Sequence, residues 1–317
     1  MSFCVLGTGS YVPPKVVTND DLTAFLDTSD EWIRERTGIR QRHVCTEESA
    51  CDLAYQAAKN ALEQSGTSPE ELDMILCATI SSDFATPSMA CVVQKRLGAS
   101  CPAMDLNAAC SGFLFLLDTA AGFFARGRVK KMLVIGAERI SRLLDWDDRS
   151  TCVIFGDGAG AMVLGEGDCY LASQLFSKGD DEVIRTPVFE GKSPFNKREQ
   201  ESPYIHMKGQ ETFRFAVNAM THDLKQLIAQ AGFSEEDIAW VVPHQANIRI
   251  IDAARKRLNI PPDRFCVNID RYGNTSSASI PMMVDELNRS GRLHRGDLLA
   301  LCAFGGGLSS AACILRW

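Results

Sequence analysis

The chain has 317 residues, enough for one large domain or two fused ones. Hydrophobic residues make up 45% of it and charged residues 23%, a balance typical of globular proteins, which excludes a disordered or fibrous chain. The formal net charge of -7 makes the surface as a whole unsuited to nucleic acid. No apolar run approaches the ~18 to 20 residues that span a bilayer, so we expect no membrane segment.

The N-terminal residues MSFCVL predict a short strand and lack the features of a signal peptide, so we expect a cytoplasmic protein. The twelve cysteines are scattered from Cys4 to Cys313 without a CxxC pair. This spacing supports neither a zinc site nor a thioredoxin-type motif, and we predict no metal. In a reducing compartment, most of the cysteines are expected to be small buried residues.

Several short patterns recur later in the chain in the same order. Residues 66–76 (GTSPEELDMIL) predict a helix end, a turn and a strand, and residues 232–242 (GFSEEDIAWVV) repeat this pattern 166 positions later. A Gly-Arg pair ahead of an apolar strand also recurs, 164 positions later. We therefore expect a duplication, with an N-terminal half at 1–170 and a C-terminal half at 171–317. A site where equivalent turns of the two halves meet is a natural consequence.

Cys110 lies in the segment AACSGF, between strand-like residues 103–107 and an apolar run at 114–125. The run predicts a buried helix that ends at a glycine. Cys110 is therefore expected at a strand-to-helix turn, at the positive end of that helix. This position stabilises a thiolate and is expected to lower the pKa of the thiol below its usual ~8.5. The same backbone amides are suited to an oxyanion.

Two other segments supply polar groups. An apolar strand ends at Pro243, so His244 lies at the strand exit, where α/β folds place functional groups. Asn274, in GNTSSAS, lies 164 residues after Cys110. The duplication then predicts that Asn274 occupies the counterpart of the Cys110 turn and faces the cysteine. Taken singly, a loop histidine satisfied by its neighbours and an ordinary turn asparagine remain alternatives.

Two glycine-containing segments differ in what they predict. Three glycines at 305–307 follow the last strong strand, and they allow backbone amides to reach a substrate oxygen. Residues 156–164 (GDGAGAMVL) lack the strand-GxGxxG-helix context of a dinucleotide site. We interpret them as a close-packed turn and strand.

A cysteine, a histidine and an asparagine suit two chemistries. His244 follows Cys110 by 134 residues, within the ~130 to 150 of papain-like hydrolases. However, those enzymes carry CG[SA]C[WY] at the cysteine, and this chain has AACSGF. The other chemistry is thioester condensation, in which a thiolate accepts an acyl group and a carbanion then attacks it. A neutral imidazole and an amide can both donate to the developing enolate without adding a competing base.

Six motifs stand out along the chain: TSDEWI (28–33), RTGIR (36–40), AACSG, FGDGAGA (155–161), PHQAN and GNTSSAS. In these motifs, and over essentially its whole length, the chain resembles the β-ketoacyl-[acyl-carrier-protein] synthase III family. The resemblance implies a thiolase-like five-layered α/β/α/β/α fold in two pseudo-twofold-related halves, usually assembled as a homodimer. It also implies that a short acyl-CoA, usually acetyl-CoA, condenses with malonyl-acyl carrier protein (malonyl-ACP) to initiate type II fatty acid synthesis. The products are β-ketoacyl-ACP, CO2 and CoA, and no cofactor is expected.

The resemblance further implies the roles of individual catalytic residues. Cys110 would accept the acyl group, and His244 and Asn274 would promote decarboxylation of the malonyl group. The backbone amides of Cys110 and Gly306 would form the oxyanion hole. Phe304 would line the acyl pocket, together with Phe84 reaching in from a partner subunit.

The resemblance implies two binding surfaces as well. Trp32 and Arg149 would stack on the adenine of CoA, and Arg36 would meet a CoA phosphate. Asn247 belongs to the same expected CoA site. The expected carrier-protein patch consists of Arg249, Arg214 and Lys256, which could attract an acidic partner despite the net charge.

One departure concerns the pocket beside the nucleophile. After the glycines the chain reads Leu308-Ser309-Ser310-Ala311, where some family members carry aromatic residues. The length of the primer therefore stays open. A related condensing enzyme of specialised metabolism, of polyketide or quinolone type, is the main alternative. A cysteine hydrolase and an inactive carrier-binding paralogue are remote ones.

Overall fold

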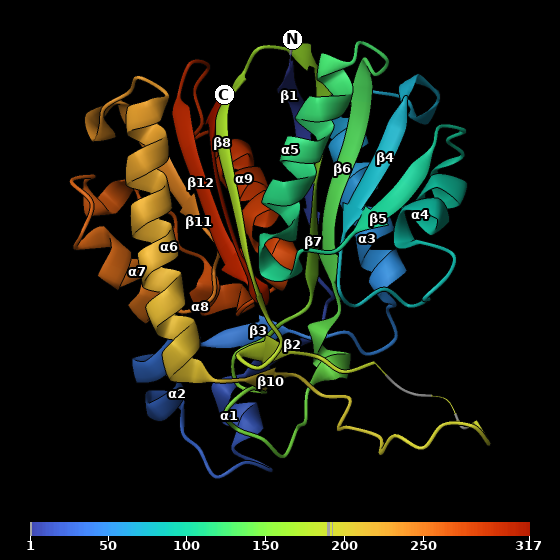
Figure 1. The fold of residues 1–317 in the computed structure, drawn as a ribbon, viewed down its shortest axis with the longest axis vertical. Helices are drawn as coiled ribbons and strands as arrows, with labels where there is room; N and C mark the ends of the chain where they lie inside the picture. The colour runs from blue at the N-terminus through green and yellow to red at the C-terminus, as the bar shows by residue number, and fades with distance from the viewer. Residues whose placement is uncertain (1, 189–190, 192) are drawn as a thin grey trace.

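Two β-sheets enclose a central layer of helices, and further helices cover the outer face of each sheet (Figure 1). The computed structural model describes residues 2–188, 191 and 193–317. The layers follow the order helix, sheet, helix, sheet, helix, which confirms the five-layered α/β fold expected from the sequence. Among the described residues, no helix combines the length and hydrophobicity needed to cross a bilayer.

Four strands follow the same order in the two sheets, and the first sheet has one further strand at its edge. The first sheet runs β1 (Ser2–Tyr11), β7 (Gly158–Gly167), β6 (Lys131–Glu138), β4 (Met74–Ala78) and β5 (Ala103–Leu106). The second runs β8 (Tyr170–Asp180), β13 (Gly307–Arg316), β12 (Leu298–Gly305) and β11 (Ile238–Pro243). In each sheet the first three strands pair antiparallel and the next pair is parallel. The two sheets are therefore repeats of one topology.

The central layer consists of α5 (Gly112–Ala125) and α9 (Ser279–Arg289), which lie between the sheets (Figure 1). α5 is apolar on nearly every side because it contacts strands of both sheets. One hydrophobic core accordingly joins β1, β6 and β7 to β12 and β13 through these two helices. Such a shared core holds both sheets at a fixed distance from the turns that precede α5 and α9.

The outer helices and small elements complete the fold. α3 (Ala50–Ser65) and α4 (Met89–Leu97) cover the first sheet, while α6 (Gly209–Gln230) and α7 (Ile248–Arg255) cover the second. The small elements are α1 (Asn19–Leu22), α2 (Asp30–Thr37), α8 (Ile269–Tyr272), β2 (Val16–Thr18), β3 (Gln41–His43), β9 (Ile184–Arg185) and β10 (His206–Met207). α2 packs against α7, which brings the N-terminal TSDEWI motif to the second half.

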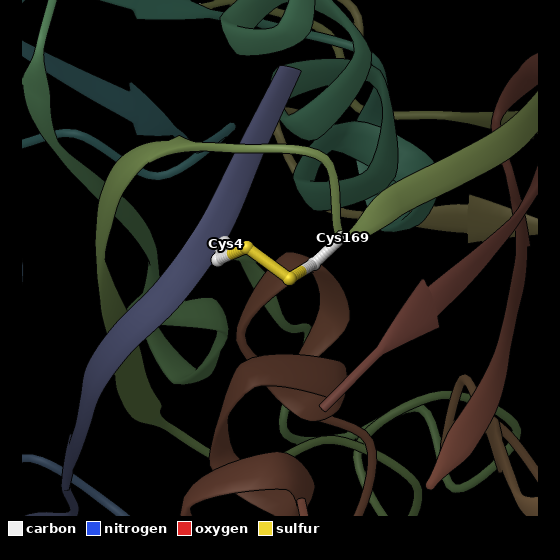
Figure 2. Close-up of a disulfide and its surroundings, with 2 residues drawn as sticks. All are labelled: Cys4 and Cys169. Carbon is white, nitrogen blue, oxygen red and sulfur yellow. A yellow bond between two sulfur atoms is a disulfide. The ribbon is translucent and has the colours of Figure 1, made fainter. Parts of the chain in front are cut away.

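A disulfide joins Cys4 of β1 to Cys169, in the turn between β7 and β8 (Figure 2). The pair spans 165 residues, and nothing in the cysteine spacing predicts it. Asp168 lies beside the pair. While the sulfurs are bonded to each other they are not thiolates, so this group offers a metal only one carboxylate. The other ten cysteines are free, and eight of them are buried, as expected.

Candidate active site

Cys110 lies in a tight turn, η2 (Ala109–Ser111), between β5 and α5. Ala109 has a positive φ of 48°, and its backbone N–H donates to Asn107 Oδ1 at 3.1 Å. The end of β12 packs directly against this turn, since a Cβ on Gly305 would lie 2.7 Å from the Cys110 nitrogen. A glycine at position 305 is therefore what lets the second half reach the nucleophile turn.

Cys110 as a whole residue is half-buried, but its thiol group is buried, and the sulfur accepts a hydrogen bond from Ser276 Oγ at 3.4 Å. Burial of the group raises the pKa of Cys110 to about 11, the hydroxyl of Ser276 opposes this, and the negative charge of Glu138 adds to it. The expectation of a lowered pKa was therefore wrong for this state. The regular helix begins only at Gly112, and desolvation of the thiolate outweighs the stabilising groups.

His244 follows the last residue of β11, and its backbone N–H donates to Cys302 O at 2.8 Å. Its Nδ1 lies 2.7 Å from Ser279 Oγ, while Nε2 is buried without a hydrogen-bond partner among the described residues. The ring of Phe304 packs edge-on at 5.5 Å. Burial lowers the pKa of His244 to about 3, so the imidazole is neutral at physiological pH.

Asn274 begins the turn that leads into α9. Its backbone is fixed by hydrogen bonds to Ile154 O and from Gly156 N, at 2.9 and 3.1 Å. Its Oδ1 accepts from Ser276 N at 2.8 Å, and the side-chain nitrogen makes no hydrogen bond to the described residues. That nitrogen is therefore available as a donor.

The two active-site turns are equivalent, but their register differs from the expected one. η2 begins at Ala109 and η6 (Ser276–Ala278) begins at Ser276, an offset of 167 rather than 164. The counterpart of Asn274 is therefore Asn107, and the counterpart of Cys110 is Ser277. The two turns are in contact, as expected for equivalent turns of the two halves. The pairing of Asn274 with Cys110 at an offset of 164 was wrong, and the orientation of Asn274 towards the cysteine stays a prediction.

One loop links all three predicted catalytic residues. Asn274 caps Ser276, which donates to Cys110, and Ser279 of the same loop contacts His244. Neither serine was singled out from the sequence. Both lie in the GNTSSAS motif, which is the only sequence signal that points to them.

The residues predicted to complete the oxyanion hole and to line the acyl pocket have different surroundings. They are Gly306, Phe304 and Phe84. Gly306 lies between β12 and β13, next to the Gly305 that packs on the cysteine turn. Phe304 is buried against the His244 ring. Phe84 lies in the loop between β4 and α4 with 52% of its surface exposed, so within one chain it is not part of the buried site.

The structure brings together the residues expected to bind CoA. The guanidinium groups of Arg36 and Arg149 lie 4.4 and 5.2 Å from the centre of the Trp32 ring. Asn247 caps α7 through Arg249 N, and its Nδ2 donates to Arg36 O at 2.9 Å. Asn247 therefore has a structural role, because its side chain connects the end of α2 to the start of α7 through these two hydrogen bonds.

The three residues expected to bind the carrier protein lie on the outer helices of the second half. Arg249 and Lys256 are exposed at α7, and neither forms an ion pair with the residues that the structure describes. Arg214, on the adjacent α6, makes one long contact of 3.9 Å with Glu211 and is also exposed. These cations are therefore largely free to attract an anionic partner.

Comparison with known proteins agrees with the fold and the motifs. The family described as 3-oxoacyl-[acyl-carrier-protein (ACP)] synthase III matches residues 104–179, and its C-terminal part matches residues 228–317. A β-ketoacyl-[acyl-carrier-protein] synthase III of Clostridium acetobutylicum is 46% identical over 99% of this chain and 98% of its own length. The crystal structure of the corresponding synthase from Aquifex aeolicus superposes with a TM-score of 0.94 at 44% identity, covering 99% of this chain and all of that one.

A priming β-ketosynthase from the R1128 polyketide pathway is also similar, with a TM-score of 0.92 and 34% identity over 99% of this chain and 96% of that one. The synthases III of Clostridium acetobutylicum and Aquifex aeolicus are more similar to this chain, at 46% and 44% identity over 99% of its length. The chain therefore belongs to the β-ketoacyl-[acyl-carrier-protein] synthase III family.

Proposed function

We propose that this chain condenses a short acyl-CoA, most simply acetyl-CoA, with malonyl-ACP to give β-ketoacyl-ACP, CO2 and CoA. The observation that carries the proposal is the single loop that connects the nucleophile Cys110 to Asn274 and His244. Its polar groups suit two successive half-reactions at one sulfur. The chemistry uses side chains and backbone amides and needs no metal or cofactor.

In the first half-reaction the Cys110 sulfur attacks the carbonyl carbon of the acyl-CoA, the bond from that carbon to the CoA sulfur breaks, and the thiol proton of Cys110 leaves with CoA. The tetrahedral intermediate carries a negative oxygen. We assign its stabilisation to the backbone amides of Cys110 and Gly306, since β12 ends against the cysteine turn. The acyl group remains on the sulfur.

In the second half-reaction the malonyl thioester loses CO2, and the resulting carbanion attacks the acyl group on Cys110. The bond from the acyl carbon to the Cys110 sulfur then breaks, and the released thiolate takes up a proton. Enolate charge develops on the thioester oxygen. When Nδ1 of His244 accepts from Ser279 Oγ, the ring proton resides on Nε2, which is then a neutral donor. Nδ2 of Asn274 supplies the second donor. Neutral donors fit this role because they stabilise the enolate without protonating the carbanion.

The surroundings support three further proposals. The stacked Trp32, Arg36 and Arg149 cluster would receive the CoA nucleotide, and the Arg249, Lys256 and Arg214 patch would dock the acidic carrier protein. We also propose a homodimer. Its interface would include the exposed edge strand β5 and the exposed Phe84 ring, which needs a partner to reach an acyl pocket.

Two remaining proposals concern organisation and location. The turn between β7 and β8 supports a division of the chain into halves at 1–170 and 171–317, because β7 belongs to the first sheet and β8 to the second. We retain the cytoplasm as the proposed location, on the strength of the CoA and carrier-protein substrates.

A direct assay tests the proposed function. Purified protein is mixed with acetyl-CoA and malonyl-ACP, and the products are followed by mass spectrometry of the carrier protein and by release of CO2. We expect acetoacetyl-ACP from the native chain and none from Cys110→Ala. Turnover of a different primer only, with acetyl-CoA inert, would favour the alternative in specialised metabolism. That alternative is supported by the Leu308–Ala311 departure and the resemblance to the polyketide priming enzyme.

A further inference from the structure

A carboxylate is fully buried behind the nucleophile. Glu138, the last residue of β6, has no exposed surface. It accepts four hydrogen bonds, from Ser81 Oγ at 2.6 Å, Ser277 Oγ at 2.8 Å, Ile80 N at 3.1 Å and Thr79 Oγ1 at 3.2 Å. It forms no ion pair with any residue the structure describes. Burying a carboxylate among neutral donors is costly: burial raises the pKa of Glu138, while the hydrogen bonds from Ser81, Ser277 and Ile80 oppose that rise.

The two oxygens of Glu138 hold different parts of the molecule. Oε2 accepts from the 79–81 segment, which follows β4 and leads to Phe84. Oε1 accepts from Ser277, in the Asn274 turn of the other half. The turn packs closely here, since a Cβ on Gly136 would lie 2.6 Å from Ser277 O. Glu138 therefore adds a side-chain attachment of the Asn274 turn to the first sheet, beside the backbone hydrogen bonds of Asn274 to Ile154 and Gly156.

Glu138 is also electrostatically linked to the nucleophile. Ser276, which donates to the Cys110 sulfur, directly precedes the Ser277 that donates to Glu138. Burial is the main cause of the raised pKa of Cys110, and the charge of Glu138 raises it further. A carboxylate in this position thus acts on both the placement of the turn and the ionisation of the thiol.

We propose that Glu138 is a positioning residue of the condensing site: through Ser277 it holds the Asn274 turn against the cysteine turn, and from one residue beyond the serine that donates to Cys110 it opposes ionisation of the thiol. The part of the inference that concerns decarboxylation rests on the proposed function. The part that concerns the thiol does not, because the reactivity of Cys110 can be measured without any substrate.

Other titratable groups near the cysteine turn do not supply this charge. On the elements packed against the turn they are Cys302 of β12, Cys313 of β13, Asp118 of α5 and Arg316, which is exposed at the far end of β13. Burial raises the pKa of both thiols, which therefore remain neutral. Asp118 lies six residues beyond the start of α5, about 9 Å along the helix. His244 is neutral at physiological pH because burial lowers its pKa.

Glu138→Gln removes the charge while keeping the network. The amide oxygen can take the place of Oε2 and accept from the 79–81 segment. The amide nitrogen then donates to Ser277 Oγ, whose own proton has an acceptor in Ala78 O at 3.0 Å. The matched control is Asp285→Asn, a buried carboxylate on α9 that accepts from the hydroxyls of Thr8 and Ser10.

The first measurement is the rate of Cys110 alkylation by iodoacetamide as a function of pH, mapped by peptide mass spectrometry. Losing a nearby negative charge stabilises the thiolate, so Glu138→Gln is expected to shift the profile to lower pH by on the order of one unit. Asp285→Asn is expected to leave it in place. A folded Glu138→Gln protein with the native profile would overturn the electrostatic role.

Ser277→Ala tests the positioning role without touching the carboxylate. We expect malonyl-ACP decarboxylation to fall by about tenfold or more, while acylation of Cys110 by acetyl-CoA stays within about twofold. Equal losses in both steps, or no loss in either, would overturn the positioning role. Asn274→Ala, measured alongside, separates the two ideas. If decarboxylation survives that change as well, the proposed function of Asn274 has failed rather than its link to Glu138.

Discussion

Asn107 and Asn274 make the same hydrogen bond at equivalent places in the two halves. Each Oδ1 accepts from the backbone N–H two residues later, at 3.1 Å from Ala109 and 2.8 Å from Ser276. Those two residues share an unusual backbone, with φ of 48° and 49°. The same turn thus occurs in both halves, directly before Cys110 in one and directly after Asn274 in the other. Since alanine occupies this backbone at position 109, alanine is also expected to be tolerated at position 276.

Ser276→Ala is expected to make the Cys110 thiol harder to ionise. The Ser276 hydroxyl lowers the pKa of Cys110 by donating to the sulfur, so its removal shifts the alkylation profile to higher pH. The measurement is iodoacetamide labelling of Cys110 between pH 6 and 10. Ser290→Ala, at the far end of α9, is the control. A profile moving to lower pH would contradict the assigned direction of this hydrogen bond.

His244→Ala is expected to separate the two half-reactions. Acyl transfer from acetyl-CoA to Cys110 remains, because it uses the backbone amides. Decarboxylation of malonyl-ACP falls by ~10² to 10³, the usual cost of removing one donor to an oxyanion. Rapid-quench mass spectrometry of the enzyme and of the carrier protein follows each step. If acylation were lost as well, His244 would be acting as the base for the thiol.

The buried imidazole also predicts how stability depends on pH. The pKa of His244 is about 3 in the folded chain, below its ordinary 6.5, so between these values only the unfolded chain is protonated there. Its contribution to stability is complete above pH 6.5 and is lost, by about 1.4 kcal/mol per pH unit, as the pH falls towards 3. Urea unfolding at pH 7 and pH 5 measures the change. In His244→Gln the difference between the two pH values should be smaller by about 2 kcal/mol, and an unchanged difference would show that the imidazole is solvated.

Gly305→Ala and Gly306→Ala are predicted to differ, although they are neighbours. A Cβ at 305 would lie 2.7 Å from the Cys110 nitrogen, whereas at 306 the nearest atom, Ile184 O, is 3.3 Å away. Overpacking of this kind costs about 1 to 3 kcal/mol, so Gly305→Ala is expected to slow acylation of Cys110 by about tenfold or more. Gly306→Ala keeps its amide and most of the rate. The reverse order of rates would mean that β12 does not pack on the cysteine turn as described.

Arg249→Glu is expected to impair the carrier protein rather than CoA. The exposed cation has no anionic partner in the described structure, so its reversal acts mainly on an acidic partner. We predict that KM for malonyl-ACP rises ~10-fold while KM for acetyl-CoA stays within about twofold. Lys59→Glu, on α3 of the opposite outer layer, is the control. Equal effects on both substrates would refute the docking role.

Motifs in the sequence were sufficient to predict the fold and to place Cys110, His244 and Asn274 at facing turns. The duplication was also visible, but its register at the site was not, because the matched patterns lie at several different offsets. Only the three-dimensional turn shows that Asn274 corresponds to Asn107. Short motifs show which elements recur in the two halves. Insertions and deletions between the motifs determine which individual residues of the two halves are equivalent.

Features that depend on long-range packing could not be predicted. Ser276, Ser279 and Glu138 act through contacts with residues far away in the chain, and serines in a turn carry no such signal by themselves. The raised pKa of Cys110 could not be predicted for the same reason. The sequence indicated that a helix starts near Cys110, but it did not indicate that the thiol is buried. The disulfide between Cys4 and Cys169 connects β1, at the edge of the first sheet, to the turn that enters β8, at the edge of the second. No local sequence pattern predicts this contact.

The central claim is that Cys110 is the acyl acceptor, and intact-protein mass spectrometry after mixing with acetyl-CoA tests it most directly. The account predicts one stable adduct with the mass of a single acetyl group, mapped to Cys110 and absent from Cys110→Ala. Longer and branched acyl-CoAs in the same experiment rank the primers. An acetyl adduct on another residue, or acetylation that persists in Cys110→Ala, would contradict the account.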